Sequence, residues 1–411
     1  MGTELFPPLA PARGRSLEGI LPLIDKTFPV PGRFRRDLPG NVADLSRLLT
    51  SSRNERSLSY LNRPPLLSAY LRYFLPWNLY RLCRLLPGLD LPLAPGDAVL
   101  DLGSGPLTLP AALWISRPEL RSLPLEFRCL DRSGAALEAG RKFFAALAGE
   151  NCPWTVKTIS GEVRPGPARP LSVGLGGKAP ALIGALYLYN EICQPIPPED
   201  PGALSRLAES QAAFLAGLGG EGGRILLLEP GVPRSGEFIS LLRGHFIRLG
   251  CLPLAPCLHS RPCPLGKGEN RTKRAAKWCH FAFDTKDAPR ALRNLSAAAG
   301  IPKDRATLSF LLVEKPPLAR TAMTGAAPVP LPPAEALLRI ISDPFPLPAG
   351  GGEAGHCNLY GRYGCGERGL VLVRGGRRRI ESLASGALTR VKPGAGEDPK
   401  SGALVGDLES T

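Results

Sequence analysis

Three cysteines in one basic stretch have the residue type and spacing of a metal or iron–sulfur site. Five residues separate Cys257 from Cys263, and fifteen more separate Cys263 from Cys279. Each has a proline or an aromatic residue beside it, whereas buried core cysteines normally lie in apolar periodic runs. Thiolate is the ligating form, and nearby Lys and Arg favour it. The pattern predicts a metal or iron–sulfur site, against the alternative of three unrelated free thiols.

Such a site needs a fourth soft ligand. Cys365, in a glycine-rich turn of a predicted hairpin, is the first choice, and Cys357 is the near alternative. An iron–sulfur cluster prefers four cysteines. Zinc would accept four thiolates or a set that includes His259 or His280. Cluster and zinc therefore both remain open at this point.

A basic loop joins the second and third cysteines. Its one acidic residue is Glu269, and its basic residues are Lys267, Arg271, Lys273, Arg274 and Lys277. The loop is either a solvated surface or, when a metal site holds it, a phosphate-binding one. Over the whole chain 51 Lys and Arg oppose 36 Asp and Glu, a net charge of +15. This excess favours an acidic partner such as nucleic acid.

A predicted strand that runs into a glycine turn is the second motif. Asp101, Gly103, Ser104 and Gly105 form this turn, and glycine there lets the backbone approach a nucleotide-like ligand. Leu107 stands where the pyrophosphate fingerprint of dinucleotide enzymes would need glycine. The alternative is an ordinary tight turn between a strand and a helix.

Two more polar residues are predicted to complete a cofactor pocket. Asp131 ends the next strand, where its carboxylate can accept hydrogen bonds from both hydroxyls of a ribose. Asn190, in Tyr-Asn-Glu after the fourth strand, either faces the ligand or caps a helix.

Apolar runs that alternate with helical stretches predict a doubly wound α/β sheet. The predicted parallel strands are Ala98–Leu102, Leu125–Leu130, Ala181–Leu188 and Arg224–Leu228. The intervening helices include Leu109–Ile115 and Gly134–Leu147. Phe281–Phe283 and Thr307–Val313 are predicted as the last two strands, around a helix at Ala288–Ala299.

Five regions are predicted along the chain. They are a helical N-terminal region (1–95), an α/β domain (96–315) with a cysteine-rich insertion (251–280), a linker (316–333), a small β-rich module (334–385) and a disordered tail (386–411). The sequence contains no apolar run of about eighteen residues, the length that a membrane-spanning helix needs, so we expect no membrane span. Ten cysteines without a secretion signal predict reduced thiols in the cytoplasm, and we expect a monomer.

Together these motifs resemble the methyltransferase-like small-ribosomal-subunit proteins, whose best-known members act in mitochondrial ribosome assembly. The segments that carry the resemblance are 100–106, 189–191, 228–231, 255–264 and 278–281, and the similarity runs from about residue 40 to 375. The cysteine segment is its most specific part.

The resemblance implies a class I S-adenosylmethionine methyltransferase fold and binding to small-subunit ribosomal RNA. It also implies a 4Fe-4S cluster on Cys257, Cys263, Cys279 and Cys365. Such a protein would support assembly of the small subunit or translation. The alternatives are an rRNA-binding assembly factor that uses the fold as a scaffold, and a zinc-stabilised methyltransferase of another substrate. No catalytic residue is assigned, because the chain lacks an Asn-Pro-Pro-Tyr base clamp.

Overall fold

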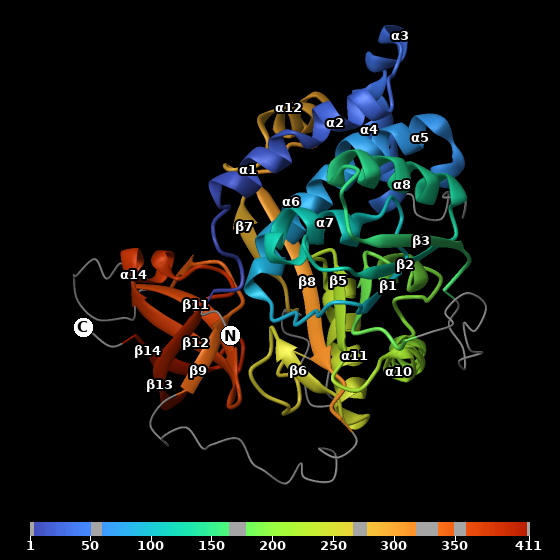
Figure 1. Cartoon of the computed structure of the whole chain (residues 1–411). Coiled ribbons are helices and arrows are strands. Elements are labelled where there is room, and N and C mark those ends of the chain that lie inside the picture. The colour runs from blue at the N-terminus through green and yellow to red at the C-terminus, as the bar shows by residue number, and fades with distance from the viewer. Residues whose placement is uncertain are drawn as a thin grey trace. The chain divides into compact units, whose positions relative to one another are not determined.

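A computed structural model describes most of the chain (Figure 1). The described residues are 4–50, 60–163, 178–265, 278–317, 336–348 and 359–408. Contacts divide the chain into two compact units. The N-terminal unit is Pro7–Pro197 with Asp284–Ala306, and the C-terminal unit is Met1–Phe6, Pro198–Phe283 and Thr307–Thr411. The division passes through the predicted 96–315 domain, so its strands form two groups.

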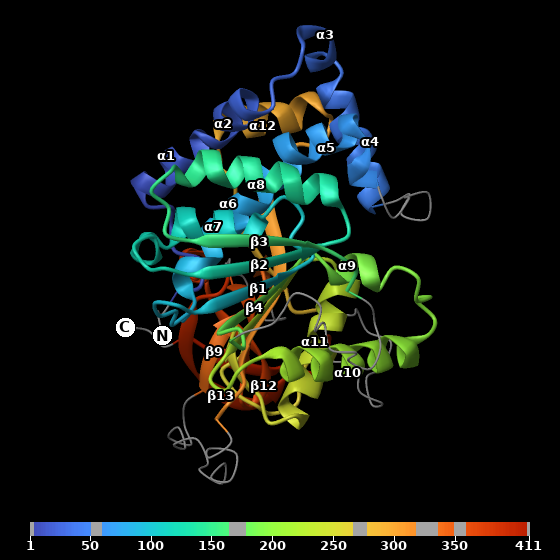
Figure 2. The ribbon, with the colours of Figure 1, turned by 45° about the vertical axis from the view of Figure 1, so that its right-hand side comes forward.

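Four parallel strands form the sheet of the N-terminal unit. They are β1 (Ala98–Leu102), β2 (Glu126–Asp131), β3 (Thr155–Ser160) and β4 (Leu182–Leu186), in the order β3-β2-β1-β4 (Figure 2). Every residue of β1 and β4 is buried, which explains why their sequences are continuous apolar runs. The order is that of one half of a doubly wound sheet, as the class I methyltransferase prediction requires.

The helices of this unit begin before β1 and continue between the strands. They are α1 (Pro11–Glu18), α2 (Ile20–Thr27), α3 (Gly32–Arg35), α4 (Leu38–Thr50), α5 (Pro64–Ala69), α6 (Leu75–Leu85), α7 (Thr108–Ser116), α8 (Gly134–Ala148), α9 (Tyr189–Ile192) and α12 (Arg290–Ala298). Ser133 caps α8, since its side chain accepts a hydrogen bond from the Ala136 amide. Gly140 lets α8 pack on the glycine turn, because a Cβ there would lie 2.5 Å from the Pro106 carbonyl carbon.

The sheet strands of the C-terminal unit are partly antiparallel. They are β5 (Arg224–Glu229), β6 (Leu252–Ala255), β7 (Phe281–Asp284) and β8 (Arg305–Glu314). β8 runs antiparallel to both β5 and β6, and β7 pairs with it. Two helices accompany these strands, α10 (Pro201–Leu218) and α11 (Pro233–Arg248). The fold is thus mixed α/β, with a parallel-rich Rossmann-like sheet that ends in antiparallel strands.

Two strands have no clear signal in the sequence. Most side chains of β3 are exposed or half-buried, and β6 has four residues, one of them Pro253. Edge strands of this kind need no apolar run, and proline is tolerated in them. Within the described residues, no helix has the length and apolar composition needed to cross a bilayer.

The C-terminal β module is a small closed barrel. Its strands are β9 (Ala336–Ile340), β11 (Leu359–Gly366), β12 (Gly369–Gly376), β13 (Leu388–Glu397) and β14 (Leu404–Asp407). Pairing runs β9-β11-β12-β14-β13 and returns to β9, and only the β12–β14 pair is parallel. The short β10 (Phe345–Pro346) lies between β9 and β11, and α14 (Arg377–Ser382) lies between β12 and β13. A five-stranded Greek-key barrel with this order is an OB-fold.

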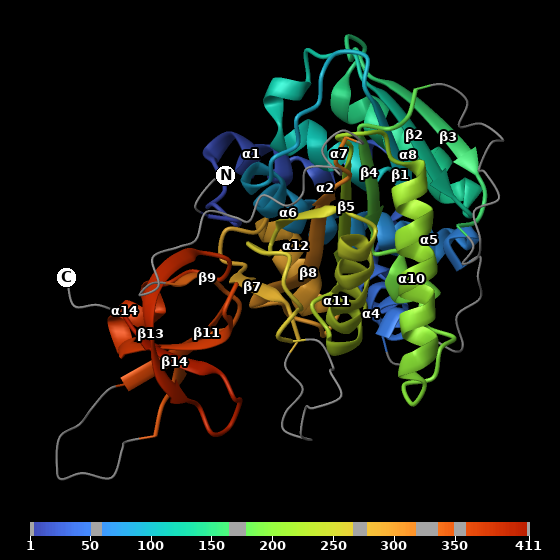
Figure 3. The same cartoon turned by 90° about the horizontal axis from the view of Figure 1, so that it is seen from below.

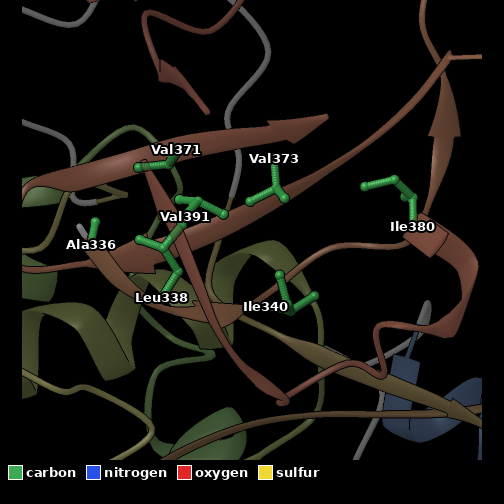
Figure 4. Close-up of a cluster of buried hydrophobic side chains, with 7 residues drawn as sticks. All are labelled: Ala336, Leu338, Ile340, Val371, Val373, Ile380 and Val391. Carbon is green, nitrogen blue, oxygen red and sulfur yellow. The ribbon is translucent and has the colours of Figure 1, made fainter. Parts of the chain in front are cut away.

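The barrel strands curve around a common interior (Figure 3). A cluster of aliphatic side chains from β9, β12, α14 and β13 fills it (Figure 4). Its buried members are Ala336, Leu338, Ile340, Val371, Val373, Ile380 and Val391. Gly364 of β11 also faces this interior, because a Cβ there would meet Leu338 at 2.9 Å.

The predicted end of this module and the predicted disordered tail are wrong. The module does not stop at residue 385, because β13 and β14 come from the 386–411 segment. The polar, Gly- and Pro-rich composition concealed these strands, since a barrel strand buries its inward residues alone. Val391 is one such residue. Most of the predicted 316–333 linker lies outside the described residues.

We expect Val391→Ala to destabilise the barrel. Removing two buried methyl groups should cost about 2 kcal/mol of unfolding free energy. Denaturant unfolding measures this loss, and Glu397→Gln, an exposed change on the same strand, should have almost no effect. Equal midpoints for both variants would contradict the assignment of residues 388–397 to the barrel.

Candidate functional site

A cavity of about 250 Å³ opens in the N-terminal unit. Its walls come from the turn after β1, the ends of β2 and β4, and the segments 60–70 and 161–163. Gly103, Gly105 and Asp131, all predicted for cofactor binding, line it. Ligands of open α/β sheets bind beyond the carboxyl ends of the strands in this way.

Both glycines of the turn have backbone conformations that favour glycine. The φ angle is 69° at Gly103 and 52° at Gly105. A Cβ on Gly103 would lie 2.8 Å from Cδ1 of Leu188, so this position cannot carry a side chain without movement. A Cβ on Gly105 would meet no protein atom within 4 Å. The backbone at Gly105 therefore borders space that a ligand can occupy.

Two backbone amides hold the carboxylate of Asp131. Gly105 donates to Oδ2 at 2.8 Å, and Ser133 donates to Oδ1 at 2.7 Å. Burial raises the pKa of Asp131, and these hydrogen bonds oppose that effect. Each carboxylate oxygen keeps a further lone pair, so Asp131 can still accept hydrogen bonds from ligand hydroxyls.

Asp101 and Ser104 support the turn instead of lining the cavity. Asp101 is 1 % exposed and Ser104 is 2 % exposed, and the Ser104 hydroxyl donates to Asp101 Oδ2 at 2.6 Å. Asn190 is also not among the lining residues, and its Nδ2 donates to the Tyr187 carbonyl at 3.3 Å. The sequence could not separate ligand contacts from their supports, because both occur in one short motif.

Leu107 adopts the conformation that a glycine would have taken. Its φ of 58° is left-handed, and it is the residue from which α7 begins. Its side chain is fully buried and lies against the position of Gly140. Packing thus maintains a backbone geometry that non-glycine residues rarely adopt.

Several cavity residues were not predicted. Arg132 donates to Glu191 Oε2 at 2.7 Å, and Tyr60 donates to Glu191 Oε1 at 3.2 Å. All three line the cavity, together with Tyr70 and Tyr187. Glu191 and Arg132 adjoin predicted residues, so their positions were a usable signal. Tyr60 is 131 positions from Glu191, and no local pattern connects them.

These groups suit the binding of a hydroxylated ligand with a flat ring. Burial, followed by the charges of Glu191 and Asp131, raises the pKa of Tyr70, which therefore stays a neutral phenol. The cavity combines a fixed carboxylate, an ion pair and aromatic faces. It matches the usual composition of cofactor sites.

The cysteine site lies in the C-terminal unit. Cys257 and Cys263 follow β6, Cys279 precedes β7, and Cys365 belongs to β11. Burial raises the pKa of Cys279 well above its ordinary value, and the charges of the other three cysteines raise it further. The four cysteines therefore lie near enough to one another for their charges to interact. Cys357, the alternative, lies outside the described residues.

Two buried arginines accompany these thiols. Arg243 and Arg339 are each 3 % exposed. Arg243 donates from Nε to the sulfur of Cys257 at 3.0 Å, and Arg339 donates to the carbonyls of Pro256 and Gly386. Among the described side chains, no carboxylate pairs with either. Buried charge is costly unless it is paired, so the cysteine site favours an anionic group.

His259 also belongs to this neighbourhood. Its Nε2 lies 4.0 Å from the Cys365 sulfur, and burial lowers its pKa to about 4, an effect to which the charge of Arg243 adds. It is therefore neutral. In the part of the chain that the structure describes, no three His, Cys, Asp or Glu residues form a group that could hold one metal ion.

The predicted RNA-binding residues cannot be placed. Lys267, Arg271, Lys273, Arg274 and Lys277 all lie between residues 266 and 277, outside the described ranges. Leu265 and Trp278 are the described residues at the two ends of this segment.

No family model matches the chain, and no curated protein matches it. Solved structures that are similar in fold include several methyltransferases. One from Pyrococcus furiosus is 10 % identical, over 55 % of this chain and 78 % of that one, with a TM-score of 0.30. Another, from Thiobacillus denitrificans in complex with S-adenosyl-L-homocysteine, is 14 % identical, over 58 % and 90 %, with a TM-score of 0.30. TrmN from Thermus thermophilus is 14 % identical, over 61 % and 48 %, with a TM-score of 0.29.

We expect Asp101→Asn to change how stability depends on pH. Burial, with a further contribution from Asp131, raises the pKa of Asp101 to about 7 in the folded chain. Between about pH 4 and 7 the unfolded chain loses this proton while the folded chain keeps it, so a rising pH favours unfolding. Asparagine removes this effect. The urea midpoint of the variant, relative to that of the wild type, should therefore rise from pH 4 to 7. A difference that stays constant over this range would contradict the raised pKa of Asp101.

Proposed function

We propose that the chain binds S-adenosylmethionine in the cavity beside Gly105 and Asp131. One observation carries this proposal. The space beside Gly105 is open, and the Asp131 carboxylate, which two backbone amides hold at the end of β2, lies next to it. A ribose can lie against the glycine backbone and donate both hydroxyls to Asp131. The bound cofactor would supply an activated methyl group, and Tyr60, Tyr70 and Tyr187 could position its rings and the acceptor.

We further propose that Cys257, Cys263, Cys279 and Cys365 hold a 4Fe-4S cluster. The buried guanidiniums of Arg243 and Arg339 support an anionic group there, and a cluster with four thiolates is anionic. A tetrahedral zinc ion would need sulfurs about 3.8 Å apart. A cluster attaches each thiolate to a different iron, so its ligands lie farther apart.

The proposed partner is the small ribosomal subunit, through its RNA. Support comes from the net charge of +15 and from the five basic residues of the 266–277 segment. The chain would support assembly of the subunit or translation in the cytoplasm.

The cofactor proposal can be tested with two matched glycine variants. Gly105 and Gly96 both have positive φ, and at each of them an added Cβ would have no protein atom within 4 Å. Gly105→Ala and Gly96→Ala should therefore each lower the unfolding free energy by about 1–2 kcal/mol, because alanine disfavours positive φ. By calorimetry, only Gly105→Ala should weaken S-adenosylmethionine binding, by at least tenfold. A wild type that does not bind at high micromolar ligand would refute the proposal.

The cluster proposal predicts the iron content of single variants. Replacing Cys257, Cys263, Cys279 or Cys365 by Ser should lose iron and lower stability, because ligand binding energy is also folding energy. Cys251→Ser changes a buried cysteine of the same unit and should retain iron, as should Cys357→Ser. Anaerobic purification with iron, sulfide and visible absorption measurements gives the answer. Colourless protein that carries zinc would exclude the cluster.

The partner proposal predicts a salt-dependent interaction. Neutralising Lys267, Arg271, Lys273, Arg274 and Lys277 together should weaken binding to small-subunit RNA of any sequence. Each lost phosphate contact should reduce the log–log salt slope by about one unit at most. Cosedimentation with small subunits at the wild-type salt midpoint would show that the segment does not contact RNA.

A further inference from the structure

A second cavity, of about 240 Å³, lies in the C-terminal unit and has walls rich in aromatic rings. Two stacked pairs line it. The rings of Trp278 and His280 have centroids 4.8 Å apart with an interplanar angle of 23°. Those of Phe345 and Tyr363 are 5.2 Å apart at 28°. Such flat apolar faces in one cavity suit a planar ring as the ligand.

The cavity occupies the ligand-binding side of the barrel. Phe345 belongs to the connection between the first two barrel strands, β9 and β11, while Tyr363 and Leu370 belong to β11 and β12, the second and third. The hydroxyl of Tyr363 donates to Asp398, in the loop between the last two strands, at 3.1 Å. OB-folds bind oligonucleotides with these strands and loops.

The outer face of β11 connects this cavity with the cysteine site. Gly364 faces the barrel interior, and successive side chains of a strand alternate, so Tyr363 and Cys365 both face outward. Cys365 approaches His259 of the cysteine segment, and Tyr363 lines the cavity. One strand therefore supplies a residue to each.

Hydrogen bonds fix the orientation of two cavity rings. Trp278 Nε1 donates to the carbonyl of Gly231 at 3.0 Å. His280 Nδ1 lies 3.2 Å from the carbonyl of Trp278, a distance at which the ring N–H can donate to that carbonyl. The rings are therefore held in place before a ligand enters.

The overall charge of the chain also favours a polyanionic ligand. Its 51 Lys and Arg oppose 36 Asp and Glu, a net charge of +15. Such an excess suits a nucleic-acid partner.

We propose that this cavity binds one unpaired base of single-stranded RNA, stacked on the aromatic rings. The proposal rests on the RNA partner named above and adds how that RNA is held. Stacking is tolerant of sequence because every base has a flat face. The barrel would thus hold the unpaired RNA through the described rings of this cavity.

The test uses a ten-nucleotide single-stranded RNA of mixed sequence with a central 2-aminopurine. Anisotropy of a terminal dye reports binding, and 2-aminopurine fluorescence reports stacking. Wild type should bind and quench the base. Phe345→Leu, which keeps an apolar side chain without a ring face, should lose the quenching and bind about fivefold more weakly or worse. Phe345→Tyr should retain quenching.

Phe34→Leu is the matched control, because Phe34 is 50 % exposed, belongs to the N-terminal unit and is not among the residues that line this cavity. It should bind and quench as the wild type does. Equal quenching by wild type and Phe345→Leu would overturn the base site while the RNA partner stands. No binding by the wild type at low salt would overturn both. Displacement of the base by N-acetyltryptophanamide but not by adenosine would assign the cavity to a protein side chain and overturn the proposal.

Discussion

Burying an ionisable side chain costs free energy unless hydrogen bonds, an opposite charge or a shifted pKa compensates it, and both candidate sites are built around such groups. In the N-terminal unit Asp101 and Asp131 lie beneath and beside the glycine turn, and Ser104, Gly105 and Ser133 supply hydrogen bonds to them. The turn and the carboxylates therefore depend on each other. A change in either would alter the shape of the cavity.

In the C-terminal unit the buried ionisable groups are basic instead of acidic. Arg243 of α11 contacts the sulfur of Cys257, and Arg339 of β9 donates to the Pro256 carbonyl. The two guanidinium groups come from different elements, α11 and β9, and both contact the segment 256–257. Their hydrogen bonds satisfy the donor atoms of the guanidiniums but do not neutralise the charge, which the anionic group proposed at the thiols would do. An anionic cluster would complete this arrangement.

The cysteine site includes a residue of the barrel, because Cys365 belongs to β11 whereas the other three cysteines lie between β6 and β7. β11 contributes Cys365 toward His259 and, two residues earlier, Tyr363 toward the aromatic cavity. A ligand on the cysteines would therefore contact the strand that also lines the proposed base-binding cavity. The two proposed sites are linked through β11.

Local patterns in the sequence predicted the buried strands, the glycine turn and Asp131, and they singled out the four cysteines as candidate ligands. These features have short-range signals, namely apolar runs, closely spaced glycines after a strand, and cysteines next to proline, glycine or aromatic residues. Sequence alone could not identify the edge strands β3 and β6, because edge strands require few apolar residues. It also assigned β13 and β14 to a disordered tail.

The tertiary structure decided which polar residues line each cavity and which support it. Asp101 and Asp131 look alike in sequence, yet one is enclosed beneath the turn and the other borders open space. Tyr60 reaches Glu191, and Arg243 reaches Cys257, across separations that no local pattern encodes. Barrel closure likewise depends on pairing between β9 and β13, about 50 residues apart. Contacts between distant segments arise from packing and burial of the whole chain, and for that reason only the folded structure shows them.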